Sequence, residues 1–137
     1  MKLEIKIKEG LGDIRFGMPV EAVVAVLGKP DDEEQIENVN NEFTTVLHYN
    51  ELDITLFFEG EPRQLACIDV SNEEFSLFGE DVFDLNEREL VKLMVANNYA
   101  EQDVENEDWG ERRVSFTRGN IDFFFIDDVI TSIIFGA

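Results

Sequence analysis

Two side chains could form a nucleophilic pair: His48 and Cys67, the only histidine and the only cysteine of the chain. A thiol–imidazole pair works only within hydrogen-bond reach. The alternating stretch Asp53–Phe58 separates them in the sequence and predicts a strand between them. Since neighbouring strands lie about 4.8 Å apart, two spacings exceed that reach. We therefore expect a surface histidine, a small buried or half-buried cysteine and no catalytic site.

Other reactive patterns are weak. Gly10-Leu11-Gly12 and Gly28-Lys29-Pro30 lack the spacing of a phosphate-binding loop and are predicted to be turns. The acidic runs Asp31–Glu34 and Asp127-Asp128 could bind a hard cation weakly, but neither has calcium-loop spacing, so solvated loops are the favoured interpretation. One histidine and one cysteine give no zinc set, barring an unusual carboxylate site. We expect no metal and no cofactor.

Charge narrows the range of partners. The net charge of the 137-residue chain is −20, and its acidic residues are spread over both halves. This charge disfavours nucleic acid and anionic membrane surfaces, because both would be repelled. It favours a protein partner with a basic surface, through electrostatic steering. The alternative interpretation is that the charge serves solubility alone.

The hydropathy pattern gives no sign of a membrane segment. Residues 1–8 alternate apolar and charged side chains, a pattern that predicts a strand rather than a signal peptide. No stretch approaches the roughly eighteen apolar residues of a membrane span. We expect a cytoplasmic protein, monomeric or homodimeric.

The chain repeats itself. Asp53–Phe58 recurs as Asn120–Phe125, an offset of 120 minus 53, or 67 residues. The same offset aligns further apolar positions: Phe16 with Phe83, Val23 with Leu90, Leu27 with Met94, Leu47 with Val114 and Tyr49 with Phe116. A fixed offset of this kind is typical of an internal repeat. We expect one domain, residues 1–137, built of two fused units of about 1–70 and 71–137.

Each unit is predicted to hold a helix followed by three strands. The helices are expected from about Pro19 to Leu27 and from the capping residue Asn86 to Asn97, with Glu89 completing a capping box. The expected strands are Thr44–Tyr49, Asp53–Phe58, Leu65–Val70, Arg112–Thr117, Asn120–Phe125 and Ile130–Phe135. The acidic segments Asp31–Glu42 and Glu101–Glu111 are predicted to be loops, Leu3–Lys8 an edge strand, and Phe75–Phe83 an aromatic lead-in with room for a short strand. The predicted fold class is α+β: two tandem α-β-β-β repeats forming one continuous antiparallel sheet with helices on one face.

Strand alternation predicts the two faces of this sheet. Ile54, Leu56 and Phe58 should face the helices, as should their counterparts in the second unit. Phe57 and Phe124 then lie on the opposite face, where a loop, the N-terminal strand or a protein partner must cover them. Trp109, in an acidic loop, either anchors a partner or folds back onto the core. The candidate partner-binding residues are Phe57, Phe124, His48, Thr55, Asp69, Trp109, Asp122 and Ile134.

A short motif resembles a known family. The stretch Phe16–Val23 followed by Leu27-Gly28-Lys29-Pro30 resembles the signature of the SmpA/OmlA outer-membrane assembly lipoprotein domain, with Pro19 where that family has Ser or Thr. The tandem order is similar to that of the beta-lactamase inhibitory protein family. The resemblance implies a long sheet with a concave face that binds proteins.

These observations favour a non-enzymatic protein-binding module, an acidic inhibitor of the immunity type that covers a basic partner with the open sheet face. Two alternatives remain: a scaffolding or homodimerising subunit, and a small-molecule-binding protein with a pocket between the repeats.

Overall fold

The computed structural model describes residues 3–37 and 42–137; residues 38–41, part of the predicted loop Asp31–Glu42, lie outside the described residues. Within this part of the chain there are two α-helices and thirteen strands in two sheets. The α+β class is confirmed.

The larger sheet has eight strands. Across the sheet they are β10 (Gln102–Asn106), β11 (Glu111–Phe116), β12 (Ile121–Ile126), β13 (Val129–Gly136), β7 (Gln64–Val70), β6 (Ile54–Glu59), β5 (Phe43–Tyr49) and β4 (Asp32–Glu37). Every neighbouring pair is antiparallel. The six predicted strands are therefore confirmed, and no predicted end differs from the observed one by more than one residue.

The two outermost strands correct the prediction. β4 and β10 lie in segments predicted to be acidic loops, and all their residues are exposed. With neither face buried, such a strand has no apolar alternation to reveal it; antiparallel pairing with β5 and β11 holds it in place. Charged side chains suit a sheet edge because they discourage pairing with another chain.

A smaller sheet of five short strands accompanies the long one. Its order is β3 (Ile14–Arg15), β2 (Gly10–Leu11), β1 (Leu3–Lys6), β8 (Phe75–Leu77) and β9 (Glu80–Asp81). The prediction of an edge strand at residues 3–8 is wrong, since β1 lies in the middle and runs parallel to β8. Its neighbours are only two or three residues long, too short for a clear sequence pattern. The β1–β8 pairing also ties the start of the chain to its second half.

Both helices begin and end close to where the sequence predicts. α1 spans Val20–Leu27 after Pro19, and the hydroxyl of Tyr49 donates to the carbonyl of Gly28 just beyond its end, at 2.8 Å. α2 spans Glu87–Ala96. Its capping box is present. Asn86 Oδ1 accepts from the backbone N–H of Glu89 at 2.9 Å, and the backbone N–H of Asn86 donates to Glu89 Oε1 at 3.0 Å. The structure also has two short 3₁₀ turns, Val82–Asp84 and Thr117–Gly119.

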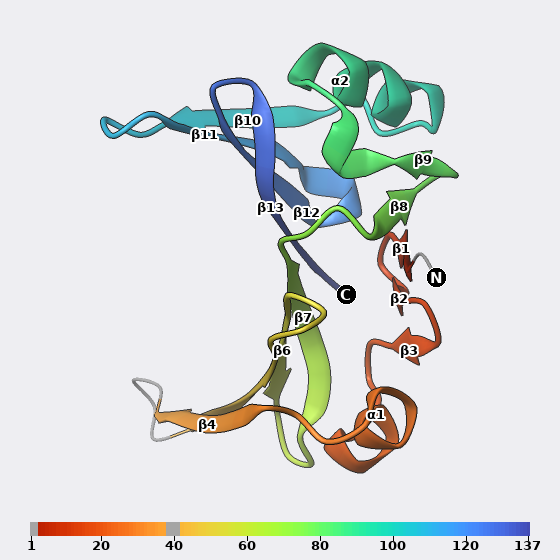
Figure 1. Cartoon of the computed structure of the whole chain (residues 1–137), viewed down its shortest axis with the longest axis vertical. Helices are drawn as coiled ribbons and strands as arrows, with labels where there is room; N and C mark the ends of the chain where they lie inside the picture. Colours follow the sequence, from red (N-terminus) through yellow and green to blue (C-terminus); the bar gives the residue numbers. More distant parts are fainter. Residues whose placement is uncertain (1–2, 38–41) are drawn as a thin grey trace.

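One hydrophobic cluster holds these elements together. The inward side chains Leu56, Phe58 and Phe123 have no exposed surface, and Val23 of α1 and Leu90 of α2 join the same cluster. The rings of Phe16, before α1, and Phe135 of β13 meet edge to face at 6.1 Å, which links the two halves. Figure 1 places the helices at opposite ends of the molecule, with the small sheet between them, to the right of the spine made by β6, β7, β12 and β13.

The capping box offers a test of local stability. Asn86→Ala removes the acceptor for the Glu89 amide, and we expect a loss of about 1 kcal/mol in the free energy of unfolding. Asn86→Asp keeps an acceptor and adds a negative charge at the helix N-terminus, so its stability should stay near that of the wild type. Urea unfolding followed by circular dichroism measures both. Equal stability of Asn86→Ala and Asn86→Asp would show that the cap contributes nothing.

Candidate functional site

The candidate site is the face of the long sheet whose side chains alternate with the core residues; we call it the open face. Strand register places one residue of each strand in a single row across it. From β4 to β10 the row is Asp32, His48, Thr55, Asp69, Ile134, Asp122, Ser115 and Asp103. Four of these eight side chains are aspartates, and we call this line the aspartate row. A negative row of this kind attracts cationic groups.

An apolar hollow lies beside the aspartate row. It has a volume of about 440 Å³ and is lined by Ile36, Thr44, Phe57, Glu59, Cys67 and Ile134. These residues come from five neighbouring strands, β4 to β7 and β13. Phe57 is half-buried in it, and Ile36 at the rim is 45% exposed. This Phe57 hollow can accept an apolar side chain next to negative charge.

Asp69 is the carboxylate at the centre of the open face. It stands between Thr55 of β6 and Ile134 of β13, and burial raises its pKa from 3.8 to about 6. A carboxylate held in this way is poorly solvated. Its charge would be stabilised by a cation that covers it, since a nearby opposite charge favours the ionised form.

The single thiol is not activated. Burial, followed by the charges of Asp69 and Glu59, raises the pKa of Cys67 to about 11, so the nucleophilic thiolate is scarce at neutral pH. β6 separates Cys67 from His48, as the sequence predicts. Nδ1 of His48 lies 3.4 Å from Thr55 Oγ1, and its Nε2 lies 3.6 Å from Glu34 Oε2.

The second half carries a fixed cation on the open face. The guanidinium of Arg113 lies 3.2 Å from Asp103 Oδ2 and 2.7 Å from Glu105 Oε2, and it also donates to Ser115 Oγ. Hydrogen bonds to these two carboxylates raise the pKa of Arg113 above its ordinary value. This end of the sheet therefore neutralises part of its own charge.

The predicted site residues do not form one patch. Thr55, Asp69, Ile134 and Asp122 are contiguous across β6, β7, β13 and β12. Phe57 shares a row with Cys67 and Gly136, whereas Phe124 shares one with Ser132, on the other side of the aspartate row.

Trp109 lies outside the rows of the open face. It sits in the turn between β10 and β11 and is 66% exposed, so it does not fold back onto the core. It remains a candidate anchor for a partner.

The sequence did not assign five residues of the two edge strands to the open face. They are Asp32, Glu34 and Ile36 of β4 and Asp103 and Glu105 of β10. Both segments were predicted to be loops, so no face was assigned to them. The same-face spacing of Asp32, Glu34 and Ile36, two residues apart, is the signal that a strand assignment would have used.

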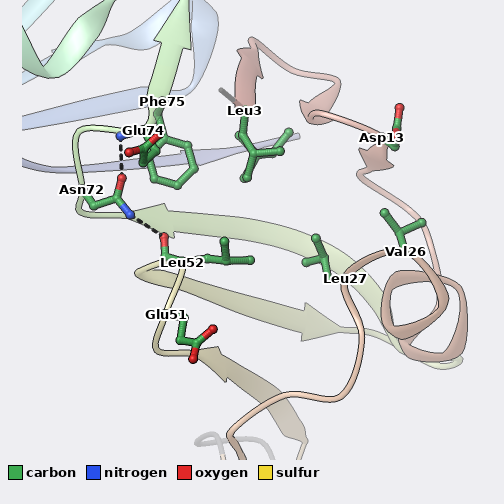
Figure 2. Close-up of a pocket in the computed structure, with 10 residues that line it drawn as sticks. Leu3, Asp13, Val26, Leu27, Glu51, Leu52, Asn72, Glu74 and Phe75 are labelled. Atoms are coloured by element: carbon green, nitrogen blue, oxygen red, sulfur yellow. Dashed lines mark hydrogen bonds between the residues drawn. The ribbon is translucent and has the colours of Figure 1, made fainter. Parts of the chain in front are cut away.

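A second hollow lies away from the open face, where α1 meets the small sheet and the β5–β6 turn (Figure 2). Its volume is about 480 Å³, and Leu3, Leu11, Val26, Leu27, Leu52 and Phe75 line it, together with Asp13, Glu51, Asn72 and Glu74. The amide of Asn72 is engaged locally: it donates to the Leu52 carbonyl at 3.0 Å and accepts from the Glu74 amide. The polar groups left at this hollow are carboxylates.

Searches of protein-family models, curated proteins and solved structures find no match to this chain. The resemblance to the SmpA/OmlA and beta-lactamase inhibitory families therefore stays a hypothesis. Within residues 3–37 and 42–137, neither helix has the length and apolarity needed to cross a membrane.

The raised pKa of Asp69 predicts an inverse pH dependence of stability. Folded Asp69 has a pKa of about 6 against an ordinary value of 3.8, so folding takes up a proton between these values and the free energy of unfolding rises as the pH falls through this window. Asp69→Asn removes this contribution. At neutral pH we expect the variant to be more stable by about 1 kcal/mol, less than the full shift implies, because the carboxyl is partly exposed and screened.

Asp122→Asn is the matched control, because it removes the same charge from the same row. Urea unfolding of the three proteins across this pH window gives the comparison. If Asp69→Asn and Asp122→Asn alter the pH profile equally, the effect belongs to net charge and the assignment to Asp69 is wrong.

Proposed function

We propose that this chain is a non-enzymatic protein-binding module, an acidic inhibitor of the immunity type, that binds a basic partner through the open face. The observation that carries this proposal is the Phe57 hollow lying directly beside the aspartate row. An apolar pocket next to desolvated negative charge suits a partner that inserts an apolar or basic anchor. Interface anchors of this kind are commonly aromatic residues or arginine, and arginine can use both features at once.

The charge distribution supports the same partner class. A net charge of −20 steers a basic protein toward the surface from a distance. At close range, a cationic group of the partner would stabilise the poorly solvated carboxylate of Asp69. The pKa of Cys67 argues against thiol catalysis, which agrees with a binding role.

We further infer that the two halves are tandem units whose helices cover the face opposite the open one. Each half has the same order of elements: a short hairpin, a helix and four antiparallel strands. β2–β3, α1 and β4–β7 make the first unit; β8–β9, α2 and β10–β13 make the second. The strand alternation, with one buried and one half-buried face, supports this arrangement.

The test is capture of the cognate partner from the source cell by the immobilised chain, followed by affinity measurement on the purified complex. Phe57→Ala should weaken binding by about 1–3 kcal/mol, roughly five- to 150-fold, because it removes the aromatic side chain that lines the hollow. Val95→Ala is the control, since Val95 is an exposed apolar residue of α2. The association rate should fall steeply with added salt.

Two results would contradict this function. One is a partner bound equally well by the wild type and Phe57→Ala. The other is a wild type that is dimeric in sedimentation equilibrium and becomes monomeric in Phe57→Glu, which would assign the face to a second copy of the chain.

The second hollow favours a different candidate, a small-molecule site. Its apolar lining and its carboxylates Asp13, Glu51 and Glu74 suit a compact organic cation. Phenethylamine should then shift the two methyl NMR signals of Leu27, and Leu52→Trp, which fills the hollow, should abolish these shifts. Shifts that persist in Leu52→Trp would mean that the amine binds the acidic surface at large.

A further inference from the structure

Three side chains at the β4 end of the open face come together across a strand pair. Asp32 lies directly opposite His48 in the β4–β5 register, and Glu34 follows two residues along β4, on the same face. One ligand atom from each of the three lies within 4.8 Å of the others. His48 Nε2 and Glu34 Oε2 are 3.6 Å apart. Two carboxylates and an imidazole thus lie close enough together for one ion to reach all three.

Thr55 fixes the direction of the imidazole. It pairs with His48 in the β5–β6 register, and its Oγ1 lies 3.4 Å from Nδ1. When Nδ1 carries the ring proton it donates to Thr55 Oγ1, and the lone pair of Nε2 is then free on the side of Glu34. Metal-binding histidines are oriented in this way, by a hydrogen bond from the nitrogen that does not bind the metal.

The second half contains the same pair of carboxylates and shows what they attract. Asp103 and Glu105 of β10 stand two residues apart on the same face, and the Arg113 guanidinium bridges them at 3.2 and 2.7 Å. In the register, Asp103 and Glu105 lie opposite Ser115 and Arg113, whereas Asp32 and Glu34 lie opposite His48 and Val46. Two carboxylates spaced in this way on an edge strand can thus bind a cation, as those of β10 do. In the first half the pair faces the imidazole of His48, a possible metal ligand, in place of a built-in arginine.

We propose that Asp32, Glu34 and His48 bind a divalent first-row transition-metal ion, through Nε2 of His48 and one oxygen of each carboxylate. For tetrahedral Zn²⁺, with bonds of about 2.0–2.2 Å, neighbouring ligand atoms are roughly 3.4 Å apart, close to the 3.6 Å between His48 and Glu34. Rotation of the two exposed carboxylates can bring the third atom to the same spacing. Water completes the coordination, because the site is open to solvent.

The mixed ligand set decides the class of ion. Imidazole nitrogen suits zinc, copper, iron and nickel, whereas calcium and magnesium prefer sets made of oxygen alone. The site stands at one end of the aspartate row, and metal binding there does not require the proposed protein partner. A bound ion would place positive charge at the end that lacks an arginine, as Arg113 does at the other.

The experiment is titration of the chelator-treated full chain with Zn²⁺ by calorimetry, and with Co²⁺ by visible absorption. We expect one equivalent to bind, with Co²⁺ ligand-field bands that report nitrogen coordination. His48→Gln should remove those bands and weaken binding about tenfold or more, and Asp32→Asn and Glu34→Gln should each weaken it similarly. Thr55→Val should weaken it less, and Thr55→Ser should restore it, because Thr55 is a positioning residue.

Glu33→Gln is the matched control. Glu33 lies between Asp32 and Glu34 in β4, carries the same charge as Glu34 and points to the other face, so its loss should leave the affinity unchanged. Circular dichroism confirms that each variant is folded. If Glu33→Gln weakens binding as much as Glu34→Gln, or if His48→Gln binds like the wild type, the ion is held by the general acidic field and the proposed site is wrong.

Discussion

The antiparallel pairing of β7 with β13 is the constraint on which the rest of the molecule depends. Ile68 and Val70 of β7 lie opposite Phe135 and Ile133 of β13, and none of the four is more than 1% exposed. This seam turns two four-stranded sheets into one. On its other face the same seam sets Asp69 against Ile134, so the join that completes the core also desolvates the central carboxylate of the open face.

Antiparallel joining also dictates how the open face is laid out. β7 and β13 run in opposite directions. The strands next to them, β6 and β12, therefore also run in opposite directions. Phe57 and Phe124 correspond in sequence, yet they end up on opposite sides of the aspartate row. The face therefore offers two separate apolar positions flanking a line of negative charge. A partner that used both would have to cross that line.

The sequence predicted correctly those elements whose buried side chains recur at a regular spacing. The middle strands β6 and β12 alternate strictly between core and half-buried positions, and both helices carry an apolar stripe and end signals, so these elements were predicted within two residues. The edge strands β4 and β10 were missed, because an edge strand exposed on both faces is held by backbone pairing, which has no side-chain signature. The predicted site was incomplete for the same reason. Phe57, Asp69 and Asp122 were assigned to the open face correctly, but the cluster of Asp32, Glu34 and His48 depends on cross-strand register.

The acidic edges also set how far the sheet can grow. An eight-stranded antiparallel sheet exposes one unpaired edge at each end, and β4 of one molecule could in principle continue onto β10 of the next, giving an open-ended filament. Four of the six side chains of β4 are carboxylates, and β10 adds two more, so such end-to-end growth must bring like charges together. Repulsion between the edges thus opposes end-to-end assembly. This barrier consists of charge, so protonation of the carboxylates or screening by concentrated salt would lower it.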